Sequence, residues 1–463
     1  MKKNLKANFD PVTLEILWSR LISIADESAA ALLRTSFSTI VRESNDFATV
    51  LMDANGDSLA ENTAGIPSFV GMLPDALKNF LKRIPLENWH PGDCIITNDP
   101  WIGSGHLPDV TMAAPIFHKE KLVGFSGSIA HLPDIGGKGM SSDCTEVYHE
   151  GLRLPVCKLQ DEGKLNELIL DIVRTNVRVP EQTIGDLMAN VACNEVGGRS
   201  LLEFMDEYNL EEIESLADAI NLHSEISMRE KIEEIPDGNY KNCIQIEGPG
   251  HPILLNAVVC VKGGEVVIDF NKTDGPVKAS INVPFCYTNA QSLYVIKCLT
   301  IPGLPNNEGS MRPVTVKAPH DCILNAQPPW PTGGRHSVGH FVVPLLMGAL
   351  APALPEKVQA DAAMMNVFSV QGKHRNGEEI SSLFFLAGGL GAMYGLDGRA
   401  VTPAPSNMTV VPTEIWENRT SMTIEKRAIL ENTGTLTEPT FNLVNEFLLT
   451  FCVSAEKPAT IRG

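Results

Sequence analysis

The sequence lacks any uninterrupted apolar run of about 18 residues, which excludes a transmembrane helix of ordinary length. Its first segment, MKKNLKANFDPVTLEIL, carries basic residues but no apolar core and no small-residue cleavage site. A secretory signal peptide needs both of those features. We therefore expect a cytoplasmic protein that neither crosses nor anchors to a membrane.

Paired cysteine motifs and basic blocks are also missing. None of the ten cysteines forms a CxxC motif, and several lie in apolar, strand-like runs such as AVVCV. This pattern predicts reduced core cysteines rather than disulfides or a zinc ribbon. The net charge is −19, and no Lys/Arg block is long enough to follow a phosphate backbone, so we expect no nucleic-acid partner.

Recognisable nucleotide-binding and hydrolase motifs are absent too. The segment GGKGMSS (136–142) does not match the phosphate-binding loop GxxxxGK[ST], and GGLGAMYGLDG (388–398) precedes no convincing βαβ unit. No GxSxG nucleophile elbow occurs. We therefore expect no nucleotide-binding residues on this chain.

The patterns that are present predict a mixed α/β (α+β), multi-domain protein. Asp10-Pro11 is typical of a helix start and precedes an apolar stripe that continues to about residue 35. Strand and hairpin patterns follow, then a long helical stretch, then a turn at 236–240 and further strands. We predict an N-terminal α/β region with metal-binding loops (1–160), a helical segment (161–235) and a β-rich, mixed C-terminal region (236–463).

The tetrapeptide His-Leu-Pro-Asp occurs twice, in NDPWIGSGHLPDV (98–110) and AHLPDIGG (130–137). Each copy is expected to follow the end of a strand. Proline favours extended geometry in the residue before it and a turn at its own position, which would direct the aspartate out of the strand. If the two strands are neighbours, the two loops converge.

Convergence of these loops would create a metal site. Imidazole and carboxylate groups are usual ligands for Zn, Mn or Fe, and a catalytic site keeps a position open for water or substrate. Asp134 would accept a hydrogen bond that fixes a histidine tautomer, which would make His106, His131 and Asp134 the catalytic group. Alternatively each copy is only a turn, but two copies favour a site. The candidate ligands are Asp46, His106, Asp109 and His131.

Two further segments carry candidate substrate contacts. TEVYHEGLRLP (145–155) contains His149, Glu150 and Arg153, which would line an anionic substrate or lie in a solvated turn. PTGGRHSVGH (331–340) places Arg335 and His336 beside two glycines. This segment would either contact a phosphate or carboxylate group of a substrate or simply pack as a loop.

Taken in order, ten segments resemble the hydantoinase B/oxoprolinase family from about residue 10 to residue 435. They are DPVTLEILWSRL, RESNDFATVL, NDPWIGSGHLPDVT, AHLPDIGG, EVYHEGLRLP, NVRVPEQTIGDLMAN, IDFNKTDGPVKASIN, NEGSMRPV, GGRHSVGH and GGLGAMYGLDG.

The resemblance implies one subunit of an ATP-dependent enzyme that opens cyclic amides, such as hydantoins, lactams and 5-oxoproline. It also implies a separate hydantoinase A-type subunit that binds ATP and Mg and phosphorylates the substrate, in an α2β2 or larger hetero-oligomer. The alternatives are a subunit of a ketone carboxylase that uses bicarbonate at the same metal, and a non-catalytic scaffold.

The resemblance places the family's metal ligands on Asp46, His106 and His131, with Asp109 as a further ligand or close neighbour. The chain departs from the family pattern after RAILENTG (427–434), where a Gly/Arg-rich segment is expected and TLTEPTFNLV stands instead. A shortened or diverged C-terminal region, or an incomplete sequence, would produce this departure.

Overall fold

The computed structural model describes residues 9–462, apart from 364, 375, 430–446 and 454–459. Its largest sheet has the strand order β2-β1-β5-β4-β3-β6-β7, and every neighbouring pair is antiparallel. The strands are β1 (Phe47–Asp53), β2 (Ser58–Glu61), β3 (Cys94–Thr97), β4 (Asp109–His118), β5 (Lys121–His131), β6 (Cys157–Asp161) and β7 (Lys164–Leu165).

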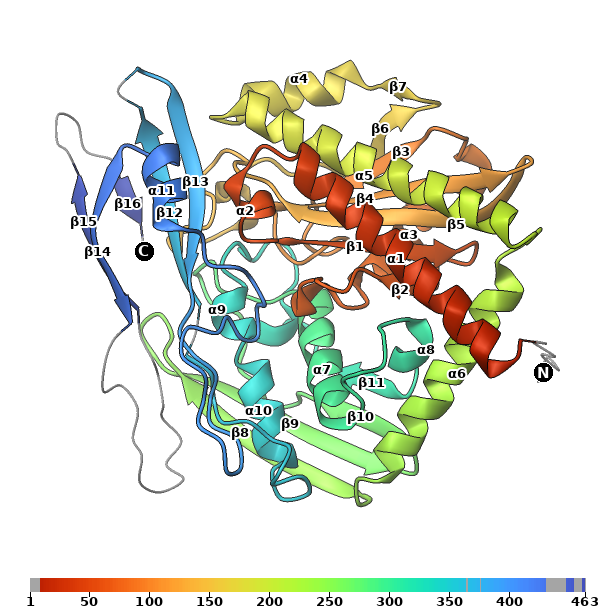
Figure 1. Ribbon diagram of the computed structural model, residues 1–463. Helices are drawn as coiled ribbons and strands as arrows, with labels where there is room; N and C mark the ends of the chain where they lie inside the picture. Colours follow the sequence, from red (N-terminus) through yellow and green to blue (C-terminus); the bar gives the residue numbers. More distant parts are fainter. Residues whose placement is uncertain (1–8, 364, 375, 430–446, 454–459, 463) are drawn as a thin grey trace.

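Helices cover this sheet on both faces. Along β5, Ser126 approaches α5 (Pro180–Glu207), whereas the next residue, Gly127, faces α3 (Met72–Arg83). Because neighbouring side chains of a strand alternate, the two helices lie on opposite faces. Helix α1 (Pro11–Thr35) packs beside α5 (Figure 1). It begins as expected, because the Asp10 carboxylate accepts backbone N–H groups of the first turn.

A second sheet, of order β11-β10-β9-β8, lies below the first in Figure 1. Helices α7 and α10 pack against it, and α6 connects the two sheets along one side. The elements of this part are α6 (Glu214–Glu233), β8 (Gly238–Ile246), β9 (Ile253–Lys262), β10 (Glu265–Asp269), α7 (Phe285–Thr300), β11 (Val314–Lys317) and α10 (Val342–Leu350). Helix α4 (Glu167–Asn176) instead packs on α5, at the top of Figure 1.

The C-terminal strands form two smaller sheets at the left edge of Figure 1, ordered β13-β12-β16 and β14-β15. Their elements are β12 (Asn366–Lys373), β13 (Glu379–Leu386), α11 (Thr413–Arg419), β14 (Met422–Ile429), β15 (Phe447–Val453) and β16 (Thr460–Arg462). Short helical turns complete the described chain: α2 (Thr39–Arg42), η1 (Pro67–Phe69), η2 (Leu86–Asn88), η3 (Val147–His149), α8 (Glu308–Met311), η4 (Ile323–Asn325) and α9 (His336–Gly339).

These sheets and helices confirm the mixed α/β class expected from the sequence. One apolar cluster joins all of the larger parts, since it contains Phe47 of β1, Leu255 of β9, Val295 of α7 and Phe385 of β13. The boundaries at 160/161 and 235/236 stay a prediction. Among the described helices, none combines the length and the hydropathy needed to cross a bilayer.

Candidate metal centre

The two His-Leu-Pro-Asp segments meet at one end of the β4–β5 pair. Asp109 is the first residue of β4 and pairs with His131, the last residue of β5. The convergence expected from the sequence is therefore present. The first copy follows β3 as expected, but the expectation that its aspartate is directed out of the strand is wrong, because Asp109 itself begins a strand. The ladder continues past that point through a hydrogen bond from Leu132 N to Pro108 O of 2.8 Å.

The Asp109 carboxylate lies between the two histidines. Its Oδ1 is 2.8 Å from His106 Nε2 and 3.0 Å from His131 Nδ1. Ligand atoms of these three residues all lie within 4.8 Å of one another, and all three side chains are buried. Asp46 precedes β1 directly, and its Oδ2 is 3.6 Å from His131 Nδ1. The structure thus brings together all four candidate ligands named from the sequence.

The second oxygen of Asp109 is occupied by protein donors. Asp109 Oδ2 accepts hydrogen bonds from Ser104 Oγ and from Arg335 Nη2, both at 2.8 Å. The Arg335 guanidinium also stacks over the Tyr287 ring, 4.5 Å from its centroid. Burial by itself raises the pKa of Asp109, but the Arg335 guanidinium and the hydrogen bonds that the carboxylate accepts outweigh burial and hold that pKa well below its ordinary value. Asp109 is therefore an anion at neutral pH.

The protonation of His106 tests whether these residues fit a cation. His106 Nδ1 is 2.9 Å from Gly333 O, and a carbonyl oxygen can only accept, so Nδ1 carries a proton. Burial, followed by the Arg335 charge, lowers the pKa of His106 to about 4, which leaves the ring neutral at pH 7. His106 Nε2 then presents a lone pair to Asp109 Oδ1, and it makes no hydrogen bond. Two facing lone pairs repel, and a metal ion bound by both atoms removes that repulsion. The residues fit a divalent metal.

The four candidate ligands line a small cavity of about 40 Å³. At roughly 10–15 Å³ for each water, it has room for about three waters. Other polar groups of the cavity wall are Tyr287, Arg335, His336 and His340. Burial, then His340, lowers the pKa of His336 well below its ordinary value, and burial, then Arg335, lowers the pKa of His340 to about 3. Both rings are neutral at pH 7 and available as donors or acceptors.

Asp134 does not contact the two histidines. Its Oδ1 accepts hydrogen bonds from Gly136 N at 3.0 Å and Arg178 Nη1 at 2.8 Å, and its Oδ2 accepts one from Arg178 N. The role that we expected of Asp134, fixing a histidine tautomer, falls to Gly333 O for His106. For His131, the neighbouring acceptor is Asp109.

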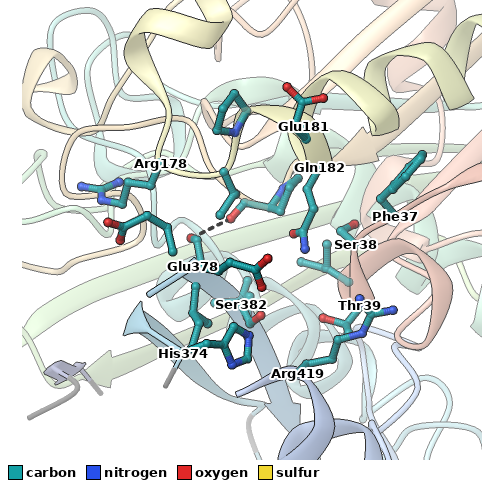
Figure 2. Close-up of a pocket in the computed structure, with 18 of the residues that line it drawn as sticks. Phe37, Ser38, Thr39, Arg178, Glu181, Gln182, His374, Glu378, Ser382 and Arg419 are labelled. Atoms are coloured by element: carbon teal, nitrogen blue, oxygen red, sulfur yellow. Dashed lines mark hydrogen bonds between the residues drawn. The ribbon is translucent and has the colours of Figure 1, made fainter. Parts of the chain in front are cut away.

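A larger pocket, of about 520 Å³, lies beside Arg178. It is lined by α2, the first turn of α5 and β13, where Ser381 Oγ donates to Pro133 O at 3.1 Å (Figure 2). None of the four candidate ligands lines it. The candidate ligands and this larger pocket are therefore in different places.

The five candidate substrate contacts separate into two groups. Arg335 and His336 line the small cavity, whereas the other three do not. Arg153 Nε bonds to Asp99 Oδ2 at 3.0 Å, and the Arg153 guanidinium lies 5.2 Å from the centroid of the Trp101 ring. His149 is exposed, and its Nδ1 lies 3.4 Å from Thr145 N. Glu150 is fully buried behind Gly333, outside the cavity.

Sequence reasoning missed the residues that close the cavity. Met365, Phe385, Ser406 and Met408 cover it from the C-terminal part of the chain, and Tyr287 lines it from α7. None of these residues belongs to a motif that indicates a particular chemistry. His340, by contrast, lies in the segment 331–340 that was already singled out from the sequence, where it follows His336 at the helical spacing of four.

A second group of possible ligand atoms, from His90, Asp93 and Asp161, lies near the surface. Lys158 Nζ reaches into it, 2.8 Å from Asp93 Oδ2 and 2.6 Å from Asp161 Oδ1. An ammonium group already provides the positive charge there, so this group is an ion-pair network rather than a metal site.

Comparison with known proteins shows which family the sequence of this chain matches. The profile of "Hydantoinase B/oxoprolinase" matches residues 10–435. A Pseudomonas sp. (strain NS671) protein, provisionally named as the B component of a D-/L-hydantoinase, is 30% identical over 444 residues, covering 91% of this chain and 75% of that protein. The beta component of the caprolactamase of Pseudomonas jessenii is 28% identical, covering 84% of this chain and 68% of its own length.

Solved structures agree with these sequence matches. The crystal structure of ATP-dependent caprolactamase from Pseudomonas jessenii superposes with a TM-score of 0.85 at 27% identity, covering 92% of this chain and 76% of that chain. An acetone carboxylase chain has a TM-score of 0.83 at 20% identity, covering 93% and 61%, which shows a shared fold. This chain spans only about a third of longer relatives such as the 5-oxoprolinase of Dictyostelium discoideum.

The family match over nearly the whole chain agrees with the order of motifs seen in the sequence and with the sheet that brings the two His-Leu-Pro-Asp segments together. The chain belongs to the hydantoinase B/oxoprolinase family.

Proposed function

We propose that this chain is the metal-binding subunit of an ATP-dependent hydrolase of cyclic amides, such as hydantoins, lactams or 5-oxoproline. One observation carries the proposal: the buried His106–Asp109–His131 cluster, in which the His106 Nε2 lone pair faces a carboxylate without a hydrogen bond. The family's relatives include proteins named as components of a hydantoinase and of a caprolactamase, which supports the substrate class.

In this proposal Asp46, His106, His131 and Asp109 hold a divalent ion, Zn, Mn or Fe. Such an ion, when bound, polarises a substrate oxygen and makes a bound water more acidic. The Arg335 guanidinium provides a fixed positive charge at the cavity wall for an anionic, phosphorylated substrate. The neutral His336 imidazole can accept or donate a proton there. Asp134 supports the site from outside, through its bonds to Arg178 and Gly136.

The ATP-dependent step belongs, in the same proposal, to a hydantoinase A-type partner that phosphorylates the substrate. The sequence of this chain contains no phosphate-binding loop. Relatives named as the B and beta components of their enzymes support assembly with a second kind of chain. The proposed assembly is a hetero-oligomer of α2β2 composition or larger.

The proposal is tested by coexpressing the chain with its A-type partner and supplying ATP with hydantoin, caprolactam or 5-oxoproline. We expect ADP and a ring-opened product, and loss of the product in the His106→Ala/His131→Ala variant. A carboxylated product from acetone or acetophenone with bicarbonate would instead identify a ketone carboxylase. Turnover that is unchanged in the double variant would contradict a catalytic role and leave a scaffold.

Metal affinity is expected to depend on pH through Asp46. Burial above all raises the pKa of Asp46 to about 7, so below pH 7 a proton competes with the metal for this carboxylate. Metal binding to the wild type must therefore displace one more proton than binding to Asp46→Asn. Below pH 7, the wild-type affinity should fall about tenfold more per pH unit than the affinity of Asp46→Asn. Competition with a fluorescent Zn²⁺ chelator between pH 6 and 8 measures both slopes. Equal slopes would show that Asp46 is not deprotonated on metal binding.

A further inference from the structure

We infer that Glu150 is a positioning residue that fixes the turn 332–335, and through it the orientation of His106 and Arg335. This inference rests on the proposed function, because it assigns to Glu150 a part in building the metal site. It also replaces the expectation that Glu150 contacts the substrate, since Glu150 does not line the cavity.

The Glu150 carboxylate holds one side of this turn. Glu150 is completely buried, and its Oε1 accepts a hydrogen bond from Gly333 N at 2.7 Å. The hydroxyl of Ser280 donates to the same oxygen. Ser280 also accepts, through its backbone oxygen, a 2.6 Å hydrogen bond from Gly334 N. Glu150 and Ser280 therefore clamp two consecutive residues of the turn.

The other side of the turn faces the metal cluster. Gly333 O accepts a hydrogen bond from His106 Nδ1. Arg335 N closes the turn by a 2.9 Å hydrogen bond to Thr332 O. Arg335 then reaches Asp109 Oδ2 at 2.8 Å. The position of the turn thus decides where the His106 lone pair points and where Asp109 is held.

A side chain would have little space at position 333, at the centre of this arrangement. A Cβ on Gly333 would lie 3.0 Å from Ser280 Oγ and 3.2 Å from Glu150 Oε1, which is closer than side chains normally approach. The turn therefore packs directly on the clamp, with no space for it to shift toward Glu150. Removing the carboxylate opens space behind the turn and leaves the Gly333 N–H with only the Ser280 hydroxyl oxygen, at 3.0 Å, as an acceptor.

The two oxygens of Glu150 have different surroundings, which allows a positioning role to be distinguished from a role that needs the carboxylate charge. Both hydrogen bonds go to Oε1, whereas Oε2 is buried without a partner among the described residues. A glutamine can keep the accepting oxygen and place its amide nitrogen at the Oε2 position. A positioning role therefore predicts that Glu150→Gln keeps the site and Glu150→Ala damages it. A substrate contact or proton donor would be lost in both variants.

The first readout is Zn²⁺ affinity of the purified full chain, measured by competition with a chelating dye. We expect Glu150→Ala to weaken Zn²⁺ binding by about 10- to 100-fold, as is typical when a group behind a ligand is removed. Ser280→Ala should have a smaller effect, and Glu150→Gln should stay within about threefold of wild type. Glu146→Ala, an exposed glutamate of the same segment, is the matched control and should leave affinity unchanged. Thermal unfolding of each metal-free variant separates loss of the site from loss of the fold.

A second readout needs no metal. Ring ¹⁵N shifts of His106, assigned by comparison with His106→Ala, should show a protonated Nδ1 in the metal-free wild type and in Glu150→Gln. Glu150→Ala should give a mixture of tautomers. Unchanged affinity and an unchanged tautomer in folded Glu150→Ala would overturn the inference, as would a Glu150→Gln variant as damaged as Glu150→Ala. A wild type that keeps the tautomer but binds no Zn²⁺, Mn²⁺ or Fe²⁺ would contradict the proposed function and not the positioning role.

Discussion

The His106→Ala/His131→Ala variant is expected to purify with less than about a tenth of a metal ion per chain, against about one Zn, Mn or Fe in wild type. Both imidazoles contact Asp109, and removing them leaves two carboxylates, too few ligands to hold an ion through purification. Inductively coupled plasma mass spectrometry measures the content directly. The protein must be prepared without chelator and without a polyhistidine tag.

A matched control removes two histidines that lie outside the cluster. His251 and His320 are both exposed, so His251→Ala/His320→Ala changes composition equally and should retain the wild-type metal content. Circular dichroism on all three proteins shows whether the fold persists. A folded wild type that contains no metal would remove the basis for the proposed chemistry and would make the two loops structural turns.

Replacing Asp109 by alanine is expected to lower the free energy of unfolding of the metal-free chain by about 3–5 kcal/mol. Arg335 is only 4% exposed, and Asp109 Oδ2 is its carboxylate partner. Loss of that partner leaves a buried guanidinium uncompensated, which is much more costly than losing an exposed ion pair. Denaturant titration followed by far-ultraviolet circular dichroism measures the change.

The second half of this test adds Arg335→Met. Removing both charges should recover a large part of the stability lost in Asp109→Ala, because a buried apolar side chain needs no counter-ion. The double-mutant cycle then isolates the interaction between Asp109 and Arg335. If Asp109→Ala lowers the free energy of unfolding by less than about 1 kcal/mol, solvent screens this pair and the site is more open than its burial indicates.

The convergence of the four candidate ligands could be predicted from the sequence because each lies in a local pattern with few meanings. His106 and His131 repeat one tetrapeptide, and antiparallel pairing of neighbouring strands brings the two copies together. Asp46 directly precedes a strand of the same sheet. Mixed α/β class and the start of α1 were predicted correctly for a similar reason, since caps and apolar periodicity are properties of short segments.

The surroundings of the site could not be predicted, because they depend on contacts between distant segments. Nothing near Glu150 in the sequence indicates that it bonds to Gly333, which lies 183 residues away. Asp134 stands in the same tetrapeptide as His131, yet it bonds to Arg178 instead of a histidine. The start of β4 at Asp109 was also missed, because proline at position 108 favoured a turn.

The residues that cover the cavity lie far along the chain from the candidate ligands. All four ligands lie within the first 131 residues, whereas Met365, Phe385, Ser406 and Met408 close the cavity. At roughly 5–20 residues per second, a ribosome needs about 12–47 s to make the 234 residues between His131 and Met365. The candidate ligands are therefore exposed to cellular ions on the growing chain before the turn 332–335 can orient His106 and before the cover is made. The ion that is abundant during translation, rather than the one that binds most tightly at equilibrium, would then be the one enclosed.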